Sequence, residues 1–107
     1  MISKEQKFIE EDLQRVVPIL VNRLDKLKNQ SILLTGATGF LGTWLFQLVH
    51  FLNNNYHMNI NLFALDRDFY DFKDKHLHLL NSKNITIIES DVRSAISLSN
   101  EVDYIIH

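Results

Sequence analysis

The chain of 107 residues has no cysteine, one proline and three glycines. Without cysteine it can form neither a disulfide framework nor a thiolate metal site. No apolar run approaches the length that crosses a membrane, and the first seven residues are polar, unlike the start of a secretory leader. We therefore expect a cytoplasmic protein that has no membrane partner.

Basic and acidic side chains are nearly equal in number. Eleven lysines and arginines face thirteen aspartates and glutamates, so the formal net charge is −2. This balance gives no electrostatic reason to expect nucleic acid or an anionic membrane as a partner. Apolar residues make up 46% of the chain and charged residues 22%, as in ordinary globular proteins. We expect one folded domain, or part of one.

The three glycines stand at equal spacing within residues 31–42, Ser-Ile-Leu-Leu-Thr-Gly-Ala-Thr-Gly-Phe-Leu-Gly. An apolar run predicts a buried strand that stops at Gly36, and an apolar helical pattern begins after the turn. Gly36 permits a sharp turn, Gly39 lets a pyrophosphate approach the backbone, and Gly42 permits close helix packing. The unpaired amides at the helix start would face the phosphates. The segment predicts a dinucleotide-binding loop, and a glycine-rich turn without a ligand is the alternative.

Strands and helices alternate along the rest of the chain. Besides the strand before Gly36, strands are expected at 60–66, 85–89 and 102–107, and helices at 40–52, irregularly within 68–82, and at 93–100. This order is typical of an α/β fold with a Rossmann-type parallel sheet of about four strands and flanking helices. The asparagines at 53–55 are expected to end the helix that begins at 40, because asparagine tolerates the left-handed conformation.

Residues 3–28 predict an N-terminal helical segment. Apolar side chains recur there at steps of three and four: Phe8, Ile9, Leu13, Val16, Val17, Leu20, Leu24 and Leu27. Pro18 interrupts the pattern and predicts two helices or a kink. We interpret the apolar stripe as packing on the chain's own core, and a docking surface for a second subunit is the alternative. The chain then divides into a helical segment, 1–30, and a partial dinucleotide-binding domain, 31–107.

Asp66 stands at the end of the strand expected at 60–66. In a dinucleotide fold, an acid at this place accepts hydrogen bonds from the adenosine ribose, and its charge disfavours a 2′-phosphate. The predicted cofactor is therefore NAD rather than NADP. Arg67 complicates this prediction, because an arginine there can pair with a 2′-phosphate or lie on the adenine. Capping of the next turn is the alternative role for Asp66.

The glycine segment, with its Gly-x-x-Gly-x-x-Gly spacing, resembles the cofactor motif of the extended short-chain dehydrogenase/reductase family. The closest type is that of the NAD-dependent sugar-nucleotide epimerases and dehydratases. The resemblance implies that the cofactor loop comprises Gly36, Thr38, Gly39, Phe40, Leu41 and Gly42. It also implies that Asp91 and Val92 hold the adenine. Capping of a short helix around 93–100 is the alternative role for Asp91, and both roles can coexist. His107 matches a histidine of the family, but the two alanines that follow it there are absent.

The family's chemistry uses a tyrosine and a lysine four residues later, where the lysine stabilises the phenolate. Here Tyr56 and Tyr70 are followed at that distance by Ile60 and Asp74, and Tyr104 lies too near the end. We therefore expect no catalytic residue, and we interpret the chain as the N-terminal NAD-binding portion of an oxidoreductase, inactive by itself. The longer parent would act on a nucleotide-sugar.

A non-catalytic module for dinucleotide binding or oligomerisation is the alternative function. An uncovered edge of the sheet also predicts self-association into a homo-oligomer. The histidines do not indicate a metal-dependent function. His50 and His57 are expected to complement the helix dipole or to lie on the surface. His76 and His78 are two residues apart, which places them on different sides of a helix, so no metal site is predicted.

Overall fold

The computed structural model describes residues 4–80, 82–91 and 101–107. The elements are α1 (Lys4–Leu24), the 3-10 turn η1 (Asp25–Leu27), β1 (Ser31–Thr35), α2 (Phe40–Tyr56), β2 (Asn61–Asp66), α3 (Tyr70–Lys75), α4 (Leu77–Leu80), β3 (Ile85–Glu89) and β4 (Tyr104–Ile106). All pairings are parallel, and the strand order is β3-β2-β1-β4. The predicted α/β fold is confirmed: a four-stranded parallel sheet with helices, preceded by a helix, consistent with a Rossmann-like fold. The helix expected at 93–100 lies outside the described residues.

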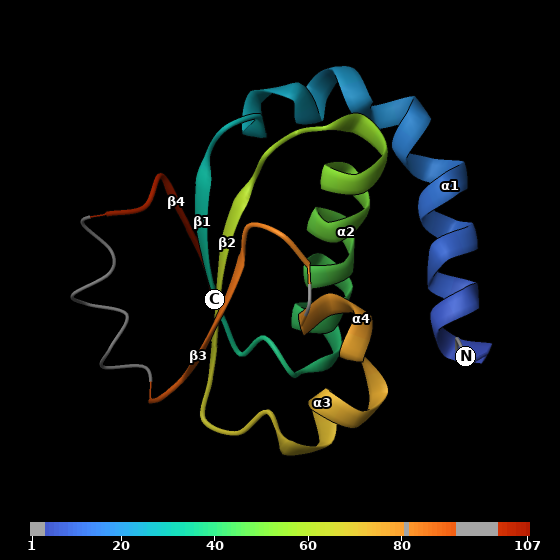
Figure 1. The fold of residues 1–107 in the computed structure, drawn as a ribbon. Helices are drawn as coiled ribbons and strands as arrows, with labels where there is room; N and C mark the ends of the chain where they lie inside the picture. The colour runs from blue at the N-terminus through green and yellow to red at the C-terminus, as the bar shows by residue number, and fades with distance from the viewer. Residues whose placement is uncertain (1–3, 81, 92–100) are drawn as a thin grey trace.

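Helix α2 lies between the sheet and α1 (Figure 1). Leu13 and Val17 of α1 are each 1% exposed and belong to the same apolar cluster as Phe46 and Leu52 of α2. Most of the apolar stripe of α1 therefore packs on the chain's own core, as the preferred interpretation predicts. Phe8, which is 67% exposed, does not.

Helix α1 continues through Pro18, so the expectation of two separate helices is wrong. The ribbon changes direction in the second half of α1 and then crosses the end of the sheet where the strands begin (Figure 1). Bending relieves the clash of a proline ring with the carbonyl one turn earlier without ending the helix. The bent path of α1 agrees with the other expectation, a kink at Pro18.

Helix α2 ends later than predicted. It runs to Tyr56, and His57 takes the left-handed conformation, with φ of 52°. The expectation that residues 53–55 end the helix is wrong because Asn53 has another use. Its side chain accepts a hydrogen bond from the amide of Ile60 (2.8 Å) and donates one to the carbonyl of Ile60 (3.0 Å). Asn53 thus joins the last turns of α2 to the start of β2.

Both faces of the sheet carry apolar side chains. Ile32 and Leu34 of β1 belong to the main cluster with α2, whereas Leu33, fully buried, belongs with Leu65 to a second cluster. Strands of a parallel sheet that are buried on both faces read as continuous apolar runs. This explains why the sequence before Gly36 lacks polar alternation.

Left-handed asparagines precede three of the strands. Asn29, Asn59 and Asn84 have φ of 64°, 53° and 70° and stand just before β1, β2 and β3. The Asn84 side chain donates to that of Asn59 (2.7 Å), which donates to that of Asn29 (3.1 Å). This row of amides joins the amino ends of neighbouring strands, at the opposite end of the sheet from the glycine segment.

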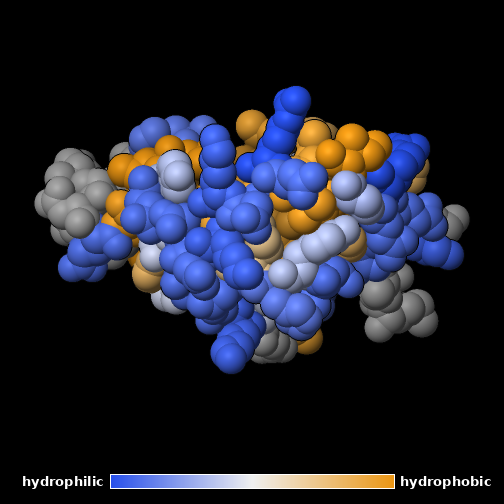
Figure 2. All heavy atoms as spheres, turned by 90° about the horizontal axis from the view of Figure 1, so that it is seen from above, coloured by the Kyte–Doolittle hydropathy of each residue, from blue (hydrophilic) through white to orange (hydrophobic). Residues whose placement is uncertain are grey.

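Seen from the end where the strands begin, the surface is mostly hydrophilic, and its apolar atoms lie in separate groups (Figure 2). Ile19 of α1 is the most exposed of the aliphatic side chains described, at 77%. Among the described residues, no helix is both long enough and apolar enough to span a bilayer.

Gln47 of α2 supplies a test of the packing. It is 2% exposed, and neither Nε2 nor Oε1 of its side chain has a hydrogen-bond partner among the described residues. A buried amide without partners lowers stability by about 1–3 kcal/mol. We predict that Gln47→Leu raises the free energy of unfolding in urea by about this amount. The exposed Gln14→Leu should change it by less than about 0.5 kcal/mol. A loss of stability in Gln47→Leu would contradict the packing described.

Candidate functional site

The glycine loop (residues 36–42) connects β1 to α2 as predicted. Gly36 has φ of +66°, a left-handed conformation that favours glycine, and Gly39 is the N-cap of α2. A Cβ on Gly42 would lie 2.3 Å from the Gly36 carbonyl oxygen and 2.9 Å from the Ala37 Cα. Gly42 therefore allows the first turn of α2 to contact the backbone of the glycine loop. The sequence predicted that Gly42 lets the helix pack closely on the sheet, whereas the atoms nearest to it belong to the loop.

The backbone amides of the glycine loop fall into two groups. Three have acceptors inside the protein: Ala37 to Leu65 O (3.3 Å), Thr38 to Asp66 Oδ2 (3.0 Å) and Gly39 to Gly36 O (3.1 Å). The first bond of α2 is from the Thr43 amide to Gly39 O (2.8 Å). The amides of residues 40–42 thus belong to the first turn, where no carbonyl of the helix itself lies one turn earlier, and none of them has an acceptor among the described residues. They are the donors that a bound anion would take.

Asp66, at the end of β2, contacts the glycine loop directly. Its Oδ2 accepts hydrogen bonds from the Thr38 amide (3.0 Å) and hydroxyl (2.7 Å), and its Oδ1 accepts one from the Arg67 amide (2.7 Å). Burial raises the pKa of this carboxyl, but the hydrogen bonds from Thr38, Arg67 and Asp68 together lower it below its ordinary value. Asp66 is therefore an anion that fixes the loop at the end of β2.

These bonds limit how much more Asp66 can do. A carboxylate has about four acceptor sites. The Thr38 bonds use both sites on Oδ2, and the backbone bonds of Arg67 and Asp68 bring the number of bonds to four. A ribose hydroxyl at Asp66 would therefore replace one of these bonds.

The other predicted site residues lie near the same edge. Arg67 is exposed. The Ser90 amide donates to the Asp66 carbonyl (2.9 Å), so Asp91 stands one residue beyond the last bond between β2 and β3. Val92 lies outside the described residues. The structure thus brings the loop and Asp66 into contact and places Asp91 after the neighbouring strand.

A contact between β1 and β4 closes the other side of the site. Thr35 Oγ1 lies 3.0 Å from His107 Nδ1, beside the glycine loop. Strand β1 stands between β2 and β4, so the chain changes direction across the sheet here. Ligands of open α/β sheets bind outside the carboxyl ends of the strands at such a switch point.

Two apolar side chains at the start of α2 face solvent. Phe40 is 93% exposed and Leu41 is 62% exposed. They flank the first-turn amides described above. Large apolar side chains exposed beside free hydrogen-bond donors are typical of a surface that a ligand covers.

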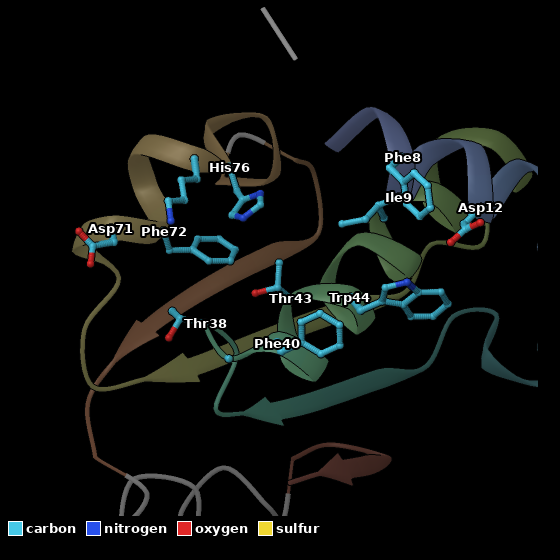
Figure 3. A pocket seen from close by; sticks show the side chains of 12 residues that line it. Phe8, Ile9, Asp12, Thr38, Phe40, Thr43, Trp44, Asp71, Phe72 and His76 are labelled. Carbon is cyan, nitrogen blue, oxygen red and sulfur yellow. The ribbon is translucent and has the colours of Figure 1, made fainter. Parts of the chain in front are cut away.

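A cavity of about 880 Å³ lies beside this surface. Phe72 and His76 form one side, Phe8 and Ile9 of α1 form the other, and Thr43 and Trp44 lie between them (Figure 3). Thr38, Gly39 and Phe40 also line it, so it adjoins the predicted cofactor loop. This cavity could not be predicted from the sequence, because nothing in the local pattern indicates that α1 and α3 face each other.

The histidines differ from expectation. A break between α3 and α4 at His76 brings the rings of His76 and His78 to 6.3 Å, so they do not point to different sides of one helix. His50 is half-buried and hydrogen-bonded, not a surface residue, whereas His57 is exposed. Within the part of the chain that the structure describes, no three metal-binding side chains converge on one point.

No family model, curated protein or solved structure matches this chain. Function is therefore inferred from the geometry of the site and from the motif.

The glycines give a prediction about stability. Gly42→Ala should cost about 1–3 kcal/mol, because its Cβ meets backbone atoms that cannot move without displacing the loop. Gly39→Ala should cost less, since its Cβ would meet only the Gly36 carbonyl oxygen, at 3.3 Å. Urea unfolding of both variants measures the difference. Equal losses would show that Gly42 does not hold α2 against the loop.

The contact between Thr38 and Asp66 gives a prediction about pH. The folded state lowers the pKa of Asp66, so the contact stabilises the fold above the carboxyl's ordinary pKa and loses this effect as the pH falls through the folded value. Thr38→Val should lower stability by about 1 kcal/mol at neutral pH, and the loss should shrink on acidification to about pH 3.

Thr43→Val is the matched control, because the Thr43 hydroxyl faces the Ala37 carbonyl (3.4 Å) and not a carboxylate. Its effect on unfolding should not depend on pH. A pH-independent loss in Thr38→Val would mean that its hydroxyl does not stabilise the Asp66 carboxylate.

Proposed function

We propose that this chain binds NAD(H) at the glycine loop, as the cofactor-binding portion of an oxidoreductase of the extended short-chain dehydrogenase/reductase type. The observation that supports this most strongly is the first turn of α2. Its amides, those of residues 40–42, have no acceptor among the described residues, and the turn follows a parallel strand through a left-handed Gly36. A pyrophosphate there would accept hydrogen bonds from these amides and lie at the positive end of the dipole of α2.

The residues present fit this cofactor. Gly39 leaves the approach to the loop open, since an added Cβ would meet nothing closer than the Gly36 carbonyl oxygen at 3.3 Å. Asp66 lies at the end of β2, where an adenosine ribose hydroxyl would exchange with one of its backbone hydrogen bonds. Asp91 follows the adjacent strand, where the family motif has its adenine contact. The negative charge of Asp66 favours NAD over NADP.

NAD supplies hydride acceptance when bound, but the family's tyrosine–lysine pair is not among the residues of the described site. Four residues after Tyr56 and Tyr70 stand Ile60 and Asp74, not lysine. We therefore expect binding without turnover by these residues alone. A nucleotide-sugar is the substrate class that the motif suggests for a longer protein that contains this domain.

A non-catalytic module is the second candidate. Oligomerisation through the stripe of α1 has weak support, since Leu13 and Val17 pack inside the chain. Self-association at the edge strand β4, whose Tyr104 and Ile105 are 45% and 42% exposed, has better support. Sedimentation of the free chain distinguishes a monomer from an oligomer.

Isothermal titration with NAD and with NADP tests the binding proposal. We expect NAD to bind more tightly, and Gly39→Val to abolish binding while the circular dichroism spectrum stays unchanged, because its methyl groups occupy the pyrophosphate approach. Asp66→Asn should weaken NAD binding by about ten-fold, or about 1.4 kcal/mol, and narrow the difference from NADP.

Asp74→Asn on the exposed face of α3 is the charge-matched control and should leave both affinities unchanged. The proposal fails if the folded chain releases no heat with either dinucleotide.

A further inference from the structure

Three imidazole rings gather where α2 meets the segment that contains α3 and α4. The rings of His50 and His78 lie edge to face at 5.6 Å, and those of His78 and His76 lie at 6.3 Å. His50 and His78 are both partly buried. We call these three residues the histidine cluster.

The hydrogen bonds of His50 fit its neutral form. The Asn54 side-chain amide Nδ2 lies 3.0 Å from His50 Nε2, and an unprotonated Nε2 can accept a hydrogen bond from it. In that tautomer His50 Nδ1 carries the proton and donates to the Ser82 hydroxyl (2.8 Å). Neutral His50 thus joins α2 to the chain that leaves α4, whereas a proton on Nε2 would remove this acceptor, and the Asn54 amide would have to turn to present its oxygen.

The surroundings also disfavour charge on both rings. Burial lowers the pKa of His50, and His78 lowers it further, against the opposite effect of Glu10. Burial likewise lowers the pKa of His78, again opposed by Glu10. Among the side chains that the structure describes, Glu10 is the charged group of α1 that acts on the pair, and one carboxylate cannot balance two imidazolium ions at this separation.

We propose that the histidine cluster is an acid-sensitive contact, which holds α3 and α4 against α2 when neutral and releases them when His50 and His78 are both protonated. Movement of α3 and α4 would change the cavity described above, because residues of this segment line it. His76 lines it and packs against Phe72, with the ring centroids 4.7 Å apart and the rings tilted by 44°, and Phe72 forms the same wall. Release of α3 and α4 therefore widens this cavity beside the glycine loop, which we call the aromatic cavity because Phe8, Trp44 and Phe72 line it.

The direction of the pH effect follows from linkage. The fold lowers both histidine pKa values, so the stabilisation is complete above their ordinary value and is lost as the pH falls toward the folded values. The pH range of this effect lies below the ordinary histidine pKa but well above that of a carboxyl group. It can therefore be distinguished from the effect of Asp66, which is lost only at lower pH.

Amide hydrogen exchange of the intact chain tests the proposal. Between about pH 7.5 and about pH 5.5, after correction for intrinsic exchange, protection in α3 and α4 should fall by roughly ten-fold or more, whereas protection in β1 and β2 changes little. The double variant with His50→Gln and His78→Gln should lose this pH dependence. His57→Asn, which alters an exposed histidine in a left-handed position, should keep it.

Two outcomes would overturn the proposal: equal pH dependence in the double variant and in the unaltered chain, or no selective loss of protection in α3 and α4. Proton NMR titration of the unaltered chain supports or contradicts it without a variant. The pKa values of His50 and His78 should both lie below the ordinary value, and normal titration of both would exclude the mechanism.

Discussion

The contact of Gly42 with the backbone of Gly36 and Ala37 determines where α2 begins. A Cβ at this position would lie 2.3 Å from a carbonyl oxygen, so the first turn of the helix can reach the loop only without a side chain. This contact sets the helix axis relative to the end of β1. The amides of residues 40–42 consequently point out of the carboxyl edge of the sheet, where the proposed anion site lies.

Two sets of polar side chains fix the sheet around that contact. At the amino ends of the strands, Asn29, Asn59 and Asn84 form a row of side-chain hydrogen bonds. At the carboxyl ends, Asp66 binds the glycine loop through Thr38, and Thr35 lies against His107. Each set crosses between strands that are distant in sequence. The loop therefore has a defined position before any ligand arrives, which reduces the ordering cost of binding.

The sequence predicted the sheet, the position of the loop and the acid at the end of β2, because these depend on local apolar patterning and on glycine spacing. It did not predict the bond between Thr38 and Asp66, since a hydroxyl between two glycines has no pattern of its own. It placed the end of α2 too early because asparagine has two uses: left-handed turns, taken here by His57, and side-chain bonds, taken here by Asn53.

The aromatic cavity and the histidine cluster also lay beyond prediction. Both arise where α1, α2 and the short helices α3 and α4 meet, and such contacts depend on how helices pack and not on residue spacing. The break at His76 shows this clearly. Helical periodicity separates it from His78, whereas the observed chain brings the two rings together.

The proposal that the glycine loop binds NAD is tested most directly by mapping backbone amide shifts in a ¹H–¹⁵N spectrum during titration with NAD. The account predicts that the largest shifts fall on residues 36–42 and 66–67, with smaller ones after β3. Shifts confined to α1 and α3 would place the ligand in the aromatic cavity instead. Either that result or an unchanged spectrum would contradict the proposal that the glycine loop binds NAD.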